Sequence, residues 1–324
     1  MKFIEALWYG KNHLAWFFLP VSWIYCGLVL IRRWLYRVGI LTSSSLPVPI
    51  VVIGNIAVGG TGKTPLLISL CELLEAQGIK AGVISRGYRG DFSGEMMVAE
   101  NSSPLEVGDE PFLIARRTKC PVSVGRDRVA AARLLLEKNK CDIILSDDGL
   151  QHYKMRRDYE IAVVDTARWH GNGFCLPAGP LREPIKRLQQ ADLVVYHGTT
   201  DQDYCFNLNL SDAVNLVTGE VKSIVEFAGN ELHAIAGIGR PARFFDQLRD
   251  RGLTIIEHAF QDHHIYNETD LDFKDEKIVM MTEKDAVKCH FYSRNNAWYV
   301  PVSANMSALL VRKVTDDIKR LVAA

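Results

Sequence analysis

Short apolar stretches alternate with amphipathic stretches along most of the chain. Residues 49–58 form a continuous apolar run rich in β-branched side chains, which predicts a strand covered on both faces. Residues 64–78 then place apolar side chains at helical spacing and end at Gly78, a common helix stop. The alternation continues with predicted strands at 80–87, 120–125, 141–149, 159–167 and 191–198 and predicted helices at 110–119 and 127–140. It predicts a mainly parallel, doubly wound α/β sheet of the P-loop NTPase type.

The pattern changes near residue 199. Between 199 and 230 the helical spacing fades, and short alternating stretches predict a connecting β segment. The remainder predicts a second, smaller α/β lobe, with strands at 231–239, 254–260, 277–282 and 297–303 and helices at 240–252 and from about 307. We therefore predict a hydrophobic N-terminal helix, a P-loop kinase domain, a connecting β segment and a C-terminal α/β lobe, at residues 1–40, 41–200, 201–230 and 231–324.

The N-terminal segment is the most hydrophobic part of the chain. Residues 14–31 contain no charged side chain, and about 20 such residues cross the hydrocarbon core of a bilayer. Tryptophans and tyrosines cluster around this run, and Arg32, Arg33 and Arg37 follow it, as expected of an interfacial belt with a cytoplasmic flank. The alternative is a buried or interface-lying helix interrupted at Pro20. Both interpretations place the protein at a membrane surface.

Charge and cysteine content exclude other classes. Basic and acidic residues number 38 each, so no overall field attracts nucleic acid, and any site for a polyanion must be built locally. The seven cysteines are scattered and include no C-x-x-C pair, which is typical of reduced thiols in a reducing compartment. No obligate protein partner is indicated.

Residues 57–64 read AVGGTGKT between a predicted strand and a predicted helix, the position of a phosphate-binding P-loop. Glycines let successive backbone N–H groups point at phosphate oxygens, while Lys63 supplies a charge for the β- and γ-phosphates and Thr64 a hydroxyl for Mg²⁺. The usual pattern begins with glycine, whereas this loop begins with Ala57. The alternatives are a chance glycine-rich turn and a dimeric regulatory ATPase, whose loop has a lysine where this chain has Val58. The predicted nucleotide-binding residues are Ala57, Val58, Gly59, Gly60, Thr61, Gly62, Lys63 and Thr64.

Three polar clusters follow predicted strands or open a predicted helix. Asp147 and Asp148 end a strand where a P-loop protein needs a carboxylate for Mg²⁺, and we favour Asp148, although the pair could merely cap a turn. Residues 108–111 read GDEP, and from the residues alone Asp109 and Glu110 favour a helix N-terminus. Residues 261–264 read QDHH and indicate either a base or substrate contact, or a surface loop.

Taken in order, GNIAVGGTGKTP, SRGYRG, GDEP, DDGLQH, LPAGPLREP, FQDHH and TEKDAVK behind a hydrophobic N-terminus resemble the tetraacyldisaccharide 4′-kinases, the lipid A 4′-kinases of Gram-negative bacteria. The resemblance covers Val51 to Lys288, and it implies that an alanine such as Ala57 is usual at the first position of the loop in this family. It implies transfer of the γ-phosphate of ATP to the 4′-hydroxyl of a tetraacylated glucosamine disaccharide 1-phosphate in lipid A biosynthesis. It also implies Mg²⁺ and work at the cytoplasmic face of the inner membrane, on that lipid.

The resemblance also implies roles for individual residues. Asp109 and His263 match a dyad that activates the sugar hydroxyl, with Lys63 at the transferred phosphate. Glu110, Asp148 and Gln151 match groups around the metal, together with Thr64 of the loop. Arg86 and Arg182 are expected to contact phosphates of the nucleotide or of the lipid. The rival function is a membrane-associated regulatory P-loop ATPase.

Overall fold

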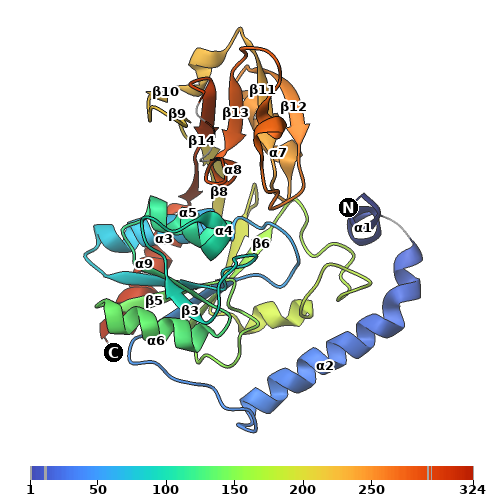
Figure 1. The fold of residues 1–324 in the computed structure, drawn as a ribbon. Helices are drawn as coiled ribbons and strands as arrows, with labels where there is room; N and C mark the ends of the chain where they lie inside the picture. The colour runs from blue at the N-terminus through green and yellow to red at the C-terminus, as the bar shows by residue number, and fades with distance from the viewer. Residues whose placement is uncertain (1, 11–12, 290–291, 293, 324) are drawn as a thin grey trace.

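The computed structural model describes residues 2–10, 13–289, 292 and 294–323, and it contains two α/β lobes with an N-terminal arm (Figure 1). The first lobe is built on a nine-stranded sheet of order β15-β8-β7-β6-β1-β5-β2-β4-β3. All neighbours pair in parallel except β3 with β4 and β15 with β8, which form antiparallel edges. The strands are β1 (Ile50–Gly54), β2 (Ala81–Ser85), β3 (Glu95–Met97), β4 (Val122–Gly125), β5 (Ile143–Asp147), β6 (Tyr159–Asp165), β7 (Leu193–His197), β8 (Cys205–Leu210) and β15 (Val302–Met306).

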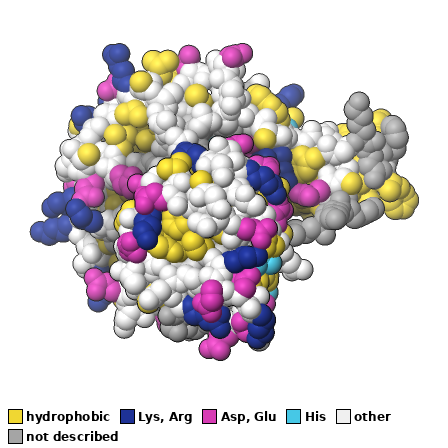
Figure 2. All heavy atoms as spheres, turned by 90° about the horizontal axis from the view of Figure 1, so that it is seen from above, with side chains coloured by type: hydrophobic (Ala, Val, Ile, Leu, Met, Phe, Trp, Pro, Cys, Tyr) yellow, Lys and Arg dark blue, Asp and Glu magenta, His cyan; other side chains and the backbone are white. Residues whose placement is uncertain are grey.

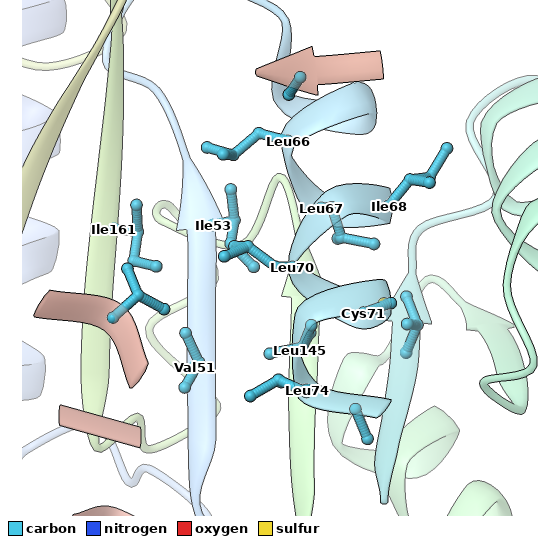
Figure 3. Packing of buried hydrophobic residues seen from close by; sticks show 14 of the residues in the cluster. Val51, Ile53, Leu66, Leu67, Ile68, Leu70, Cys71, Leu74, Leu145 and Ile161 are labelled. Carbon is cyan, nitrogen blue, oxygen red and sulfur yellow. The ribbon is translucent and has the colours of Figure 1, made fainter. Parts of the chain in front are cut away.

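Helices cover both faces of this sheet. Leu66 and Leu70 of α3 lie toward Val51 and Ile53 of β1 (Figure 3), and Leu67 is buried in the same core. Their burial removes the apolar stripe of α3 from water and fixes the helix behind the strand that leads into the phosphate loop. The helices of this lobe are α3 (Lys63–Ala76), α4 (Pro104–Val107), α5 (Asp109–Arg117), α6 (Arg128–Lys138), the 3-10 helix η2 (Ile185–Gln190) and α9 (Ala308–Ala323).

The second lobe has a six-stranded sheet of order β10-β9-β14-β13-β11-β12. Strands β12, β11, β13 and β14 are parallel, and β9 and β10 add an antiparallel edge. Its strands are β9 (Ala213–Asn215), β10 (Val221–Lys222), β11 (Glu231–Ala236), β12 (Thr254–Ala259), β13 (Val279–Thr282) and β14 (Ala297–Val300), and its helices are α7 (Pro241–Asp250), α8 (Glu283–Ala286), η3 (Ile224–Phe227) and η4 (Glu268–Leu271). The predicted fold class, a doubly wound sheet with a smaller α/β lobe, is confirmed.

The chain returns to the first lobe at its end. Residues 297–303, predicted as one strand, divide at Pro301 into β14 of the second sheet and β15 of the first. Proline donates no backbone hydrogen bond, so one continuous ladder is not expected to pass through it. Leu310 and Val314 of α9 are then buried in the core of the first lobe. The segment 231–324 therefore contributes to both sheets, while the limits of independent domains stay a prediction.

The N-terminal arm comprises α1 (Lys2–Tyr9), η1 (His13–Phe18) and α2 (Leu19–Arg37), and it runs beside the first lobe (Figure 1). Residues 14–37 form the one helical segment, within the described chain, that is long and apolar enough to cross a membrane. Pro20 lies in the first turn of α2, where its missing N–H costs no hydrogen bond. It therefore starts α2, whereas one of the two interpretations of the sequence has the helix interrupted there.

Candidate active site

The phosphate loop connects β1 to α3. Gly59 and Gly62 have φ angles of 119° and 85°, in the left-handed region that favours glycine, and Gly62 is followed directly by α3. The Lys63 ammonium donates to Oδ1 of Asn55 at 3.2 Å and lies 3.5 Å from Asp148. Asn55 in turn donates to Thr61 at 3.2 Å. The loop is thus held open around the N-terminus of α3, the arrangement that binds phosphate.

Two carboxylates end β5 beside the loop. Oδ2 of Asp147 accepts from Ser85 at 3.2 Å, while its Oδ1 is buried and accepts no hydrogen bond from the described residues. Burial, reinforced by the charges of Glu110 and Asp148, raises the pKa of Asp147 to about 7. Burial would also raise the pKa of Asp148, but the Lys63 and Arg182 charges hold it far below its usual value. Asp148 is therefore the ionised member of the pair.

A hydrogen-bonded group lies behind Asp148. Arg182 donates to Oδ2 of Asp148 at 2.9 Å, and the Gln151 amide donates to Glu183 at 2.9 Å and to the Asn55 carbonyl at 3.3 Å. Gln151 is therefore tied to the strand that precedes the phosphate loop. Asp148 has a φ of 46°, an uncommon conformation outside glycine that orients its side chain toward this group.

Asp109 and His263 meet although 154 residues separate them. Nδ1 of His263 lies 3.0 Å from Oδ2 of Asp109, which is buried at the start of α5. Burial would raise the pKa of Asp109, but its bond with His263 and the charges of Lys288 and Lys284 lower it. Asp109 is therefore ionised and can orient the imidazole.

Lys284 joins the two halves of the site. Its ammonium lies 3.1 Å from Glu110, 3.4 Å from Asp262 and 3.4 Å from Nε2 of His263. Burial would lower its pKa, but the carboxylates around it raise it, so the lysine is charged. The motif TEKDAVK contains Lys284, yet its role could not be read from the sequence, because nothing local places β13 opposite α5. Its position after a parallel strand was the available signal.

A cavity of about 960 Å³ lies between the lobes, and it collects nearly all of these side chains. Its walls come from the phosphate loop, from the carboxyl ends of β2 and β5, from the second lobe and from α2. Ala57 and Asp109 lie just outside its lining. The predicted residues that line it are Val58, Gly59, Gly60, Thr61, Gly62, Lys63, Thr64, Arg86, Glu110, Asp148, Gln151, Arg182 and His263.

His197, at the end of β7, contacts the backbone of the phosphate loop. Its Nδ1 lies 2.9 Å from the Thr61 carbonyl, and the ring stacks on Phe206 at 4.8 Å. Burial and the nearby Arg243 charge lower the pKa of His197 to about 4. Because the unfolded chain binds this proton near pH 6.5, unfolding takes up a proton between these values, and stability is lost as the pH falls through that window.

We expect the His197→Gln variant to lose less stability than the wild type between pH 7 and pH 4, by roughly 2–3 kcal/mol, because its unfolded state gains no proton at this position. Urea unfolding of both proteins at the two pH values measures the difference. The variant should be less stable than the wild type at pH 7, since it lacks the stacking on Phe206. Equal losses of stability in the two proteins would contradict the assignment.

The fold and the loop define the chain as a P-loop nucleotide-binding protein. A family model described as tetraacyldisaccharide-1-P 4′-kinase matches residues 14–319. A tetraacyldisaccharide 4′-kinase of Nitrosococcus oceani is 47% identical over 307 residues, covering 94% of this chain and 91% of that protein. A tetraacyldisaccharide 4′-kinase of Methylobacillus flagellatus is 44% identical, and the match covers 99% of this chain and 97% of that protein. The chain therefore belongs to the tetraacyldisaccharide 4′-kinase family, and it is an ATP-dependent kinase rather than a regulatory ATPase.

A solved structure agrees with this assignment. The crystal structure of an LpxK from Aquifex aeolicus in complex with ATP has a TM-score of 0.80 at 30% identity, and the match covers 95% of this chain and 99% of that one. The likeness extends over both lobes. The family and the fold predicted from the sequence motifs are therefore confirmed, while the roles of single residues stay predictions.

Proposed function

We propose that this kinase transfers the γ-phosphate of ATP to the 4′-hydroxyl of a tetraacylated disaccharide 1-phosphate in lipid A biosynthesis, working with Mg²⁺ on the cytoplasmic face of the inner membrane. The observation that carries the mechanism is the hydrogen bond between Asp109 of the first lobe and His263 of the second, because His263 lines the cavity that also contains the phosphate loop. Phosphoryl transfer depends on aligning the attacking hydroxyl with the phosphate chain and on neutralising charge. The pair of Asp109 and His263 aligns the hydroxyl, and the charge of Lys63 neutralises part of the charge on the phosphates.

The pair is built to accept a proton. The ionised Asp109 carboxylate fixes the His263 ring, whose Nε2 faces Lys284 and Asp262 at the edge of the cavity. A sugar hydroxyl placed there can give up its proton as it attacks the phosphate. His263 has a φ of 61°, and Arg89 donates to its backbone carbonyl at 3.3 Å, so the loop is held in an uncommon conformation at this point.

The donor set fits Mg²⁺. Oδ1 of Asp147 and Oδ1 of Asp148 are buried without a hydrogen bond, and Thr64 and Glu110 line the same cavity. The described residues contain no group of three acidic, histidine or cysteine side chains able to hold a metal by themselves. Mg²⁺ is usually held by one or two carboxylates together with substrate phosphates, so this sparse set suits it.

Mg²⁺ would neutralise charge on the phosphates when bound. We propose Thr64, Glu110 and Asp148 as its protein neighbours, with Gln151 behind them. The Gln151 amide is already bonded to Asn55 and Glu183, so we propose that it orients the group around the metal.

The acceptor lipid explains the N-terminal arm. Four acyl chains leave a bilayer at a cost of about 0.8 kcal/mol per exposed CH₂, so the enzyme must work where the lipid is. One side of α2 is fixed to the protein: Ser22 donates to the Cys175 carbonyl at 2.6 Å and Tyr25 to the Arg182 carbonyl at 3.1 Å. Tyr25, Val29 and Arg32 line the cavity itself.

The opposite side of α2 is apolar and exposed. Trp23, Ile24 and Leu28 expose 67%, 65% and 63% of their surface, and Figure 2 shows hydrophobic side chains on the projecting arm. A helix bonded to its own domain along one side and apolar on the other suits the membrane interface better than a bilayer crossing. We therefore propose that α2 lies in the cytoplasmic leaflet and places the cavity at the lipid surface.

We expect replacement of Trp23, Ile24 and Leu28 by serine to weaken binding to phospholipid vesicles on the order of a hundredfold, because three apolar side chains no longer leave water. Vesicle co-sedimentation measures this, and ATP affinity should be unchanged. A matched control replaces three exposed apolar residues of the second lobe by serine, namely Val217, Val221 and Val225. Vesicle binding that falls equally in both triple variants would contradict the role of α2.

The activity is tested by incubating the purified protein with γ-labelled ATP and the disaccharide lipid in mixed micelles, with Mg²⁺ or with EDTA. Label should enter the lipid fraction with Mg²⁺ only, and at the 4′-position. ATP hydrolysis without labelled lipid would contradict the proposed acceptor. Transfer that persists at full rate in EDTA would contradict the proposed metal.

A further inference from the structure

One side of α7 in the second lobe faces the nucleotide cavity. Arg243, Phe244 and Gln247 of α7 line it together with Arg240, which precedes the helix, and the spacing i, i+4 places Arg243 and Gln247 on one helix face. The Gln247 amide donates to the Leu208 carbonyl of β8 at 3.0 Å, which fixes α7 against the first lobe. The second lobe therefore presents two arginines to the cavity, Arg243 from α7 and Arg240 from the residue before it.

The two arginines differ in their partners. Arg240 is ion-paired with Asp165, at the end of β6. Arg243 is partly buried, yet among the described residues it makes neither a hydrogen bond nor an ion pair. Arg182 and Lys284, which line the same cavity, are by contrast paired with Asp148 and Glu110. A partly buried guanidinium without a partner is unfavourable, and a bound anion would satisfy it.

Arg243 lies beside the phosphate loop. Its charge is the strongest electrostatic contribution to the low pKa of His197, whose Nδ1 lies 2.9 Å from the Thr61 carbonyl. The turn before α7 also approaches the loop, since a Cβ on Gly239 would lie 3.7 Å from the Gly60 nitrogen. Loop residues 60–62 and Arg243 therefore border the same part of the cavity.

We propose that Arg243 binds the phosphate chain of the nucleotide from the second lobe, opposite the N–H groups of the phosphate loop. A guanidinium offers two parallel N–H donors that match phosphate oxygens, which a lysine at this position would not. The contact ties the second lobe to the nucleotide and so contributes to holding Asp109 and His263 together when ATP is bound. The inference rests on ATP binding at the loop and is independent of the acceptor lipid and of the membrane.

Calorimetric titration with ADP and ATP, without lipid, tests the assignment in four variants. We expect Arg243→Gln to raise both dissociation constants by about ten- to a hundredfold, the range for a charge-assisted hydrogen bond, and Arg243→Lys to raise them less. Arg249→Gln is the matched control, because Arg249 lies on the same helix but is exposed and paired with Asp246 and Glu257. It should bind both nucleotides as the wild type does. Lys63→Ala tests whether the phosphate loop is the nucleotide-binding site.

Wild-type affinity for ADP and ATP in both Arg243 variants, with Lys63→Ala impaired, would overturn the role of Arg243 and leave the phosphate loop intact. Nucleotide binding that fails to weaken in Lys63→Ala would instead contradict the loop as the site. Melting temperatures without ligand identify a folding defect. If Arg243→Gln does not fold, the nucleotide affinity of Arg243→Lys tests the proposal instead, because lysine keeps the positive charge but lacks the two parallel N–H donors of the guanidinium.

Discussion

The Asp109→Asn and His263→Ala variants are each expected to lower kcat by roughly 10²–10⁴-fold, the usual contribution of a general base. The carboxylate and the imidazole are 3.0 Å apart, and both are largely buried, so either substitution leaves the sugar hydroxyl without an oriented proton acceptor. ATP affinity should change little, because neither residue belongs to the phosphate loop. Initial rates of lipid phosphorylation at saturating ATP measure the effect.

Two comparisons sharpen this test. Residues that act as a unit lose activity together, so the double variant should be hardly slower than the slower single variant. His264→Ala is the matched control: its imidazole lies 3.1 Å from Asp270 instead of Asp109, and it should retain most of its activity. Turnover that stays at the wild-type level in both single variants would remove the pair from the mechanism.

Much of the first lobe could be predicted from local sequence. The strand, glycine turn and helix around residues 50–76 are contiguous, and their spacing alone predicts the loop that the structure contains. Helix α5 was likewise predicted, but the residues alone indicated a favourable charge at the helix N-terminus as the role of Asp109. Its pairing with His263 came from the family resemblance, because contact across 154 residues leaves no mark in local spacing.

What could not be predicted depends on long-range contacts. In the sequence, Pro301 lies in the middle of one predicted strand, since Val300 and Val302 on either side of it are apolar and only the partner strands of β14 and β15 differ. The four-residue helix α4 and the short edge strand β3 are too brief for periodicity to show. Tyr25 and Val29 of α2 belong to the apolar run 14–31 in the sequence, and their contact with the cavity follows only from the tertiary fold.

Lys63→Ala is expected to lower kcat by at least about 10²–10³-fold, comparable to the loss of one donor that stabilises a developing anion. The Lys63 ammonium lies 3.5 Å from Asp148 and 3.2 Å from Asn55, which aims it into the loop before nucleotide arrives. Alanine leaves the glycine turn in place but removes the positive charge that faces the transferred phosphate. Asp148 keeps its bond to Arg182, so the carboxylate side of the site should stay folded.

The measurement is single-turnover transfer from labelled ATP to the lipid, with enzyme in excess, so that weaker ATP binding is separated from slower chemistry. Lys119→Ala is the control for the loss of one lysine, because Lys119 is exposed and its ion pair among the described residues is with Glu75 at the end of α3. That variant should transfer label at the wild-type rate. Full-rate transfer by Lys63→Ala at saturating ATP would mean that the charge facing the γ-phosphate comes from elsewhere in the cavity, with Lys284 and Arg182 as the cations to replace next.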